Sequence, residues 1–139
     1  MIDESLDALF APLPEPRAKR APKESDLQAK IIDALNALPA VHVWKAGAYA
    51  GRASYRDRAT GAIRDRFVKI GRAGVADVIG WRTITLGSVR VAQFIAIEVK
   101  RPGESPKPHQ QRFLDRVAKA GGVAMVARSV DDVREALRR

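Results

Sequence analysis

The chain has 139 residues, enough for one compact domain, and it contains two histidines and no cysteine. Disulfide bonds, thiolate catalysis and cysteine-based zinc or iron–sulfur sites are therefore excluded, and a bound metal would need oxygen ligands, which favours magnesium or manganese. The formal net charge is +9, and residues 1–23 add nothing to it because four acidic and four basic residues cancel there. Such a surplus in the remaining residues is typical of proteins that bind phosphate backbones.

The first 23 residues differ in composition from the rest of the chain. They contain four of the eight prolines together with several acidic residues, and they do not resemble a signal peptide. No segment of the sequence reaches the ~18–20 consecutive apolar residues that span a bilayer. We therefore expect a flexible proline-rich arm over residues 1–23, a folded domain over residues 24–139, and no association with a membrane.

The first part of the domain has a helical pattern followed by a strand pattern. Apolar residues recur every three or four positions from Ser25 to Leu38, which predicts an amphipathic helix that Pro39 closes. Alternation over Val41–Lys45 predicts a short, half-buried strand. The arginine-rich segment that follows predicts a ribbon of two arms, with Ala59-Thr60-Gly61 as the turn between them.

The middle of the domain predicts an antiparallel hairpin. Ala76–Leu86 and Val89–Val99 are rich in β-forming residues, and the tight Gly87-Ser88 turn joins them.

The last third of the chain predicts helix, strand and helix. A helix is expected to begin near Ser105-Pro106 and to end at Gly121-Gly122, because proline is tolerated in a first turn and glycine often follows a last one. Val123–Ala127 predicts a buried strand, and Ser129-Val-Asp-Asp132 matches a capping box that opens a final helix. The element order predicts an α/β fold in which helices flank a small mixed β-sheet.

Three polar residues stand where the strands of the predicted hairpin begin or end. Asp77 precedes the first apolar run, and Glu98 and Lys100 flank Val99 at the end of the second strand. Residues two apart in a strand face the same side, so Glu98 and Lys100 project together, and the hairpin would bring Asp77 close to them. Two carboxylates in a poorly solvated place repel unless a cation or proton lies between them, and a divalent metal would satisfy both. An exposed Glu–Lys pair with a loop-capping aspartate is the alternative.

Basic residues cluster between Lys45 and Arg72, where eight lysines and arginines stand against two aspartates. This cluster favours contacts with a DNA backbone, although a generally basic surface would give the same composition. Tyr49 and Tyr55 lie among the arginines and would either stack on exposed bases or belong to an ordinary solvated ribbon. The predicted DNA-binding residues are Lys45, Arg52, Arg56, Arg58, Arg64, Arg66, Lys69 and Arg72.

Four segments in a fixed order carry a family resemblance, which spans roughly residues 24–135. They are Glu24-Ser-Asp-Leu-Gln28, Gly74-Val-Ala-Asp77-Val-Ile-Gly80, Ile97-Glu98-Val-Lys100, and the stretch from Ser105 through Gln110 to Gly121-Gly122. In order and spacing they resemble the VRR-NUC (virus-type replication-repair nuclease) domain of the PD-(D/E)xK nuclease superfamily. The resemblance implies a restriction-endonuclease-like α/β core and hydrolysis of DNA phosphodiesters with magnesium, for which manganese would substitute.

The resemblance also implies roles for the polar residues of the hairpin. Asp77 and Glu98 would ligate the metal, and the backbone carbonyl of Val99 would be a third ligand. Lys100 would position the attacking water and the scissile phosphate.

Two helical residues complete the implied site. Gln110 would support the lysine and the substrate phosphate, with Gln111 as the alternative. Glu24 matches an acidic residue at the start of the family's first helix, where it would either complete the metal shell or serve only the electrostatics of the helix N-terminus. The sequence departs from the family at Ala76, where a small polar residue is common, and this affects packing more than chemistry.

Stand-alone members of this size resemble Holliday-junction resolvases that act as homodimers. We therefore expect a structure-selective endonuclease of branched DNA in the cytoplasm of a bacterial or phage-infected cell, with Trp44 and Trp81 in the core or in a dimer interface. The alternatives are a non-catalytic nucleic-acid-binding module, which would need the basic residues but not the hairpin carboxylates, and a nuclease that acts on flaps or linear duplex with the same site.

Overall fold

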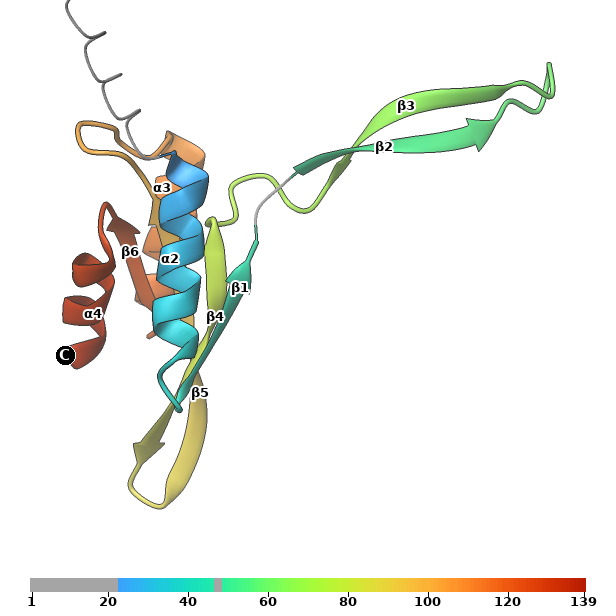
Figure 1. Cartoon of the computed structure of the whole chain (residues 1–139). Helices are drawn as coiled ribbons and strands as arrows, with labels where there is room; N and C mark the ends of the chain where they lie inside the picture. The colour runs from blue at the N-terminus through green and yellow to red at the C-terminus, as the bar shows by residue number, and fades with distance from the viewer. Residues whose placement is uncertain (1–22, 47–48) are drawn as a thin grey trace, which may run out of the picture.

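The computed structural model describes residues 23–46 and 49–139, so the predicted arm lies outside the described residues except for Lys23. Figure 1 shows a body of helices packed on a sheet, from which a long two-stranded ribbon extends. None of the described helices is long and apolar enough to cross a membrane. The elements are α2 (Glu24–Asn36), β1 (Val41–Lys45), β2 (Tyr49–Arg56), β3 (Ile63–Ile70), β4 (Val78–Leu86), β5 (Val89–Val99), α3 (Pro108–Lys119), β6 (Val123–Ala127) and α4 (Val130–Arg138).

The body is built on a four-stranded sheet with the order β1-β4-β5-β6. β4 pairs antiparallel with both β1 and β5, whereas β5 and β6 run parallel. A parallel pair needs a crossover connection, because the chain must return to the same end of the sheet, and α3 provides it. The prediction of a small mixed β-sheet flanked by helices is confirmed.

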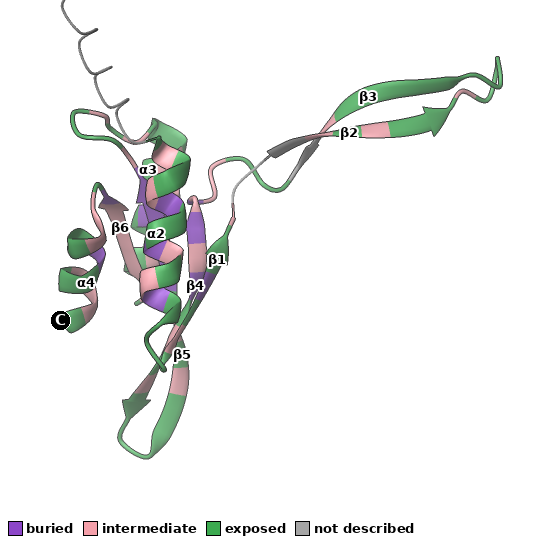
Figure 2. Ribbon diagram, viewed as in Figure 1, coloured by how far each residue is buried: buried purple, intermediate pink, exposed green. Residues whose placement is uncertain are grey.

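The helices cover both faces of this sheet. α3 packs on one face through a small cluster of Ala76, Ala96 and Leu114. Figure 2 shows that buried residues concentrate where the helices meet the sheet, and that exposed residues dominate the ribbon and the far end of the hairpin. The larger core lies on the opposite face, under α2 and α4, and consists of Ile31, Leu35, Val43, Val78, Ile95, Ile97, Val99, Ala127 and Val133.

The edge strand β1 is fixed from both sides. A Cβ atom at Gly80 of β4 would collide with the backbone of His42 and Val43, so only glycine allows this close approach of the two strands. On the outer side, Asn36 at the end of α2 donates through Nδ2 to the carbonyl of Val43 and accepts from its N–H, both at 2.9 Å. These two bonds cover part of the edge that β1 would otherwise expose.

The starts of α3 and α4 are set by the residues at the beginning of each helix. α3 begins at Pro108, later than predicted, because a residue before proline is driven into the extended conformation, and Lys107 has φ −68° and ψ 156°. The capping box of α4 is confirmed. Ser129 Oγ accepts from the N–H of Asp132 at 3.1 Å, and the carboxylate of Asp132 accepts from the N–H of Ser129 at 3.0 Å.

β2 and β3 form a separate two-stranded antiparallel sheet, which we call the ribbon. The predicted turn at residues 59–61 is present. Asp57 Oδ1 accepts from the N–H of Ala59 at 2.9 Å, and the N–H of Gly61, whose φ is +71°, donates to the carbonyl of Asp57 at 2.7 Å. The ribbon stands clear of the body in Figure 1, which leaves both of its faces open to solvent.

Candidate active site

Asp77 and Glu98 lie at the same end of the sheet on neighbouring strands. The register pairs Val78 with Ile97, so Asp77 lies just before β4 at the level of Glu98 near the end of β5. Asp77 Oδ2 accepts a hydrogen bond from the N–H of Val99 at 2.9 Å, which ties the start of one strand to the end of the other. The antiparallel hairpin thus holds the two carboxylates together.

Glu98 is a carboxylate with no exposed surface. Its Oε1 atom accepts hydrogen bonds from Lys100 Nζ, at 3.0 Å, and from Nε2 of Gln110. Its Oε2 atom is buried and has no hydrogen-bond partner among the described residues. Burial raises the pKa of Glu98 to about 7; the hydrogen bond from Lys100 lowers it, and the negative charge of Asp77 raises it further. Near neutral pH this carboxyl is therefore only partly ionised.

Lys100 connects Glu98 to the beginning of α2. Its Nζ lies 3.6 Å from Oε1 of Glu24, the first residue of that helix. Partial burial lowers the pKa of Lys100, but the hydrogen bond and charge of Glu98, with the charges of Glu24 and Asp77, outweigh it and raise that pKa above its usual value. The lysine is therefore a fixed cation between two carboxylates.

Gln110 reaches the same site from α3. Its Nε2 donates to Oε1 of Glu98, and its Oε1 accepts from the N–H of Lys107 at 2.8 Å. The structure thus places Gln110 against the carboxylate, whereas the sequence predicted that it supports Lys100. Gln111, the alternative, donates instead to Asp115 on the exposed side of the helix at 2.8 Å.

The donor atoms of this site fit magnesium or manganese, which prefer oxygen ligands. The buried Oε2 of Glu98 supports the fit, because a buried carboxylate oxygen without a partner is costly until a cation or proton completes it. No cluster of three or more His, Cys, Asp or Glu suited to a metal occurs in the described part of the chain. Any metal ligand in addition to Asp77 and Glu98 would therefore be a group other than these side chains, such as the predicted backbone carbonyl of Val99. The carboxylate of Glu24 contacts Lys100 instead.

The predicted DNA-binding residues fall into two places. Lys45 ends β1 beside the site, where the N–H of Ala46 donates to the carbonyl of Asp77 at 2.7 Å, and Arg72 lies in the loop before Asp77. The side chain of Lys69 lies outside the described part of the structure. The remaining predicted DNA-binding residues, like Lys69, lie in the ribbon or in the turn that joins its strands. They are Arg52, Arg56, Arg58, Arg64 and Arg66.

Two basic grooves are formed by residues that adjoin the active-site residues in the chain. The first has a volume of about 540 Å³ and carries the positive charges of Lys23, Lys30, Arg101 and Arg128 around Leu27, of which Arg101 is paired with Glu104 at 2.7 Å. The second, of about 350 Å³, lies between the loop before Asp77 and α3, and its basic residues are Arg72, His109, Arg112 and Arg116. Apart from Arg72, none of these residues is among the predicted DNA-binding residues; the sequence left His109 open between a DNA contact and an ordinary helix-surface histidine. The spacing of Lys23, Leu27 and Lys30 on one helical face is visible in the sequence.

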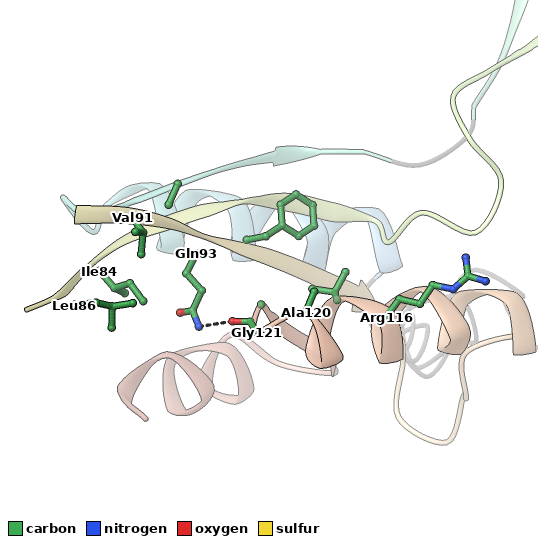
Figure 3. A pocket seen from close by; sticks show the side chains of 11 residues that line it. Ile84, Leu86, Val91, Gln93, Arg116, Ala120 and Gly121 are labelled. Carbon is green, nitrogen blue, oxygen red and sulfur yellow. Dashed lines mark hydrogen bonds between the residues drawn. The ribbon is translucent and has the colours of Figure 1, made fainter. Parts of the chain in front are cut away.

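A third groove, of about 590 Å³, lies away from the carboxylates, between the far part of the β4–β5 hairpin and the end of α3 (Figure 3). It is lined mainly by apolar side chains such as Ile84, Leu86 and Val91, and Arg116 is its one charged lining residue. Gln93 Nε2 donates to the carbonyl of Gly121 at 2.8 Å across it. This groove has no carboxylate and is not the centre of the chemistry.

Two tryptophans lie on the face of the sheet that α3 packs on, at a part that stays partly exposed, and are not part of the core. Trp44 and Trp81 pack edge to face with ring centroids 5.6 Å apart, and His42 lies 4.9 Å from Trp81. Both indoles are partly exposed, as is Phe94, which the register pairs with Trp81. Of the two predicted locations for these tryptophans, the core is therefore wrong.

The fold and the paired carboxylates with an adjacent lysine define a nuclease core of the PD-(D/E)xK type. A family model described as the VRR-NUC domain matches residues 22–131, most of the 139-residue chain, so the protein belongs to the VRR-NUC family. Membership makes it a nuclease, a hydrolase that acts on DNA. Neither a curated protein nor a solved structure matches the chain.

Proposed function

We propose that the protein is a magnesium-dependent endonuclease that cleaves branched DNA, such as four-way junctions, as a homodimer. One observation carries the metal dependence: the fully buried Glu98 has an Oε2 atom without a hydrogen-bond partner among the described residues, beside the second carboxylate of Asp77. A site of this kind calls for a cation, and its oxygen donors suit magnesium, with manganese as a substitute.

In this proposal Asp77, Glu98 and the carbonyl of Val99 hold the metal, which would supply a water of lowered pKa and neutralise charge on the phosphate. Lys100 keeps its proton because two carboxylates face it, so it binds a phosphate oxygen and orients the attacking water. Gln110 fixes the carboxylate of Glu98, and Glu24 fixes the ammonium of Lys100. Direct hydrolysis needs no covalent intermediate, which agrees with the absence of cysteine.

DNA binding would extend from the site in two directions. The two basic grooves adjoin Asp77 and Lys100 in the chain, and the arginines of the ribbon continue the positive surface outward. The preference for branched DNA and the homodimer rest on the resemblance to junction resolvases and on symmetry, because two cuts in a junction are made by two sites related by a two-fold axis. Such a substrate places the enzyme in the cytoplasm.

Cleavage of a labelled four-way junction in magnesium, in manganese and in EDTA tests the proposal, with a linear duplex and a flap of the same sequence beside it. We expect symmetric cuts in the junction with either metal and none in EDTA. If the flap or the linear duplex is cleaved faster than the junction, that DNA and not the four-way junction is the preferred substrate. Binding without cleavage in both metals would favour the non-catalytic module instead.

A further inference from the structure

Two large apolar side chains are exposed on one face of the ribbon. Phe67 exposes 78 % of its surface and Ile63 exposes 71 %, more than any other large apolar residue in the described part of the chain. They are four residues apart in β3, so both point to the same side, where the register pairs Ile63 with Arg56 and Phe67 with Arg52. Asp65, which lies between Ile63 and Phe67 in β3, is on the same side and pairs with Arg52 at 3.6 Å. This side, which we call the wedge face, thus combines two apolar side chains with arginines and one acidic residue.

The opposite face of the ribbon has different chemistry. Tyr55 on that face already lies under a cation, since the Arg66 guanidinium is 5.4 Å from the ring centroid. Arg64 on that face is paired with Asp57 at 3.2 Å. The wedge face is therefore the side of the ribbon on which large apolar groups are left open to a partner.

We propose that Phe67 and Ile63 insert against base pairs of the DNA substrate where the stacking of the helix is broken, as at a branch point. Apolar wedges of this kind stack on unstacked base steps, while flanking arginines bind the adjacent phosphates. This proposal rests on the proposed function and gives its selectivity for branched DNA a structural cause.

Charge favours DNA over a second copy of the chain as the occupant of the wedge face. Arg56 lies opposite Ile63 and Arg58 lies in the turn beyond it, whereas Arg52, opposite Phe67, is paired with Asp65 at 3.6 Å. The face therefore keeps a surplus of positive charge. A second ribbon would bring the same positive charges against these arginines, whereas a phosphate backbone neutralises them. A two-stranded ribbon is also narrow enough to enter the major groove of a duplex.

The connection between the ribbon and the site limits where the wedge acts. Ala46, which bonds to the carbonyl of Asp77, is six residues from Arg52, the partner of Phe67 in the register. Six residues span at most about 21 Å. The step to the neighbouring strand adds ~5 Å, so with base pairs ~3.4 Å apart Phe67 lies within about eight base pairs of Ala46 beside the site.

The test uses the full chain in EDTA, so that DNA is bound but not cut, with four-way junctions that carry 2-aminopurine at successive positions from the branch. We expect wild-type protein to raise the fluorescence of the probe within about eight base pairs of the cut site. Phe67→Ala should lose this signal and bind the junction about tenfold more weakly, while its affinity for linear duplex stays unchanged. Phe67→Trp should restore both.

Val89→Ala is the matched control, because Val89 is also an exposed apolar strand residue, at 58 %, but lies at the far end of the β4–β5 hairpin. Phe67→Ala and Ile63→Ala variants that match Val89→Ala in fluorescence and junction affinity would overturn the wedge while the cleavage result stands. A Phe67→Ala variant with a halved mass in light scattering would assign the face to a second copy and also overturn it. Wild-type protein that neither binds nor cuts branched DNA would remove the proposed function and the wedge together.

Discussion

Lys100 lies two residues after Glu98, and its Nζ is 3.0 Å from Oε1 of that fully buried carboxylate. The short distance follows from strand geometry, because side chains two apart project on the same side. A buried carboxylate is stable in the fold only when a nearby positive charge or a bound proton compensates its charge, so Glu98 and Lys100 depend on each other. Substitutions at this site should therefore change cleavage, proton binding and stability, and separate measurements can distinguish these effects.

Isosteric removal of either carboxylate charge should stop cleavage without weakening DNA binding. Asp77→Asn and Glu98→Gln should each lower the cleavage rate by at least about a hundredfold, since the metal loses a charged ligand. Junction affinity should change by less than about twofold, because a lost negative charge does not weaken phosphate attraction. Lys100→Ala should be equally inactive but still bind metal.

Single-turnover cleavage and fluorescence anisotropy measure these two effects separately. Manganese should raise the melting temperature of the wild type and of Lys100→Ala, but not that of Asp77→Asn, because a ligand stabilises only the fold that binds it. Unaltered turnover in Asp77→Asn would show that the metal site lies elsewhere.

The buried Glu98 predicts a pH dependence of stability in the metal-free protein. Its pKa is about 7 in the folded chain against an ordinary 4.5, so between these values the folded state holds a proton that the unfolded state has released. Stability from this group is fully present below pH 4.5 and is lost as the pH rises to about 7, by on the order of 3 kcal/mol at most. Urea unfolding in EDTA should show this loss in the wild type relative to Glu98→Gln. A difference that stays constant or grows with pH would contradict the raised pKa.

Gln110 should act as a positioning residue for the carboxylate. Gln110→Ala removes the amide that donates to Glu98, so the concentration of magnesium at half-maximal rate should rise about 10- to 100-fold while DNA affinity is retained. Gln111→Ala is the matched control, because that side chain bonds only to Asp115 among the contacts described. Equal magnesium dependence in the two variants would show that the contact with Glu98 has no role.

Local patterns were sufficient to predict most of the fold. The alternation in residues 41–45, the Gly87-Ser88 turn and the capping box at Ser129 each depend on neighbours in the chain, and each lies where it was predicted. The start of α3 was misplaced because two prolines stand two residues apart. Pro106 is compatible with a first turn, but Pro108 forces Lys107 out of the helix.

Contacts between distant segments could not be predicted in the same way. The sequence brought Asp77 and Glu98 together through the hairpin, but the contact of Gln110 with Glu98 depends on how α3 packs across the sheet. The exposure of Trp44 and Trp81 has the same origin. Alternation in β1 separates two faces of the strand, and only the placement of the helices decides which face is covered.

Neutralising the ribbon should weaken binding to all DNA and reduce its salt dependence. Replacing Arg56, Arg58, Arg64 and Arg66 by glutamine should lower the slope of log K against log salt by up to about 0.9 per lost phosphate contact. Arg64 contributes less, because Asp57 already pairs with it at 3.2 Å. Neutralising Arg134 and Arg138 on α4 is the control and should leave the slope unchanged. An unchanged slope in the ribbon variant would mean that these arginines face away from DNA.

The partly exposed tryptophans should form the contact between two copies of the chain. Trp44, Trp81 and Phe94 gather on one face of the sheet, and since ~40 % of each residue is still exposed, a partner would remove on the order of 60–100 Å² each from water. Light scattering at micromolar concentration should therefore give twice the chain mass of 15.2 kDa. A double Trp44→Ala, Trp81→Ala variant should give the mass of one chain with an unchanged far-ultraviolet circular dichroism spectrum, and it should nick junctions without making paired cuts, because each site cuts one strand. A wild type with the mass of a single chain would exclude the homodimer and leave the nuclease site intact.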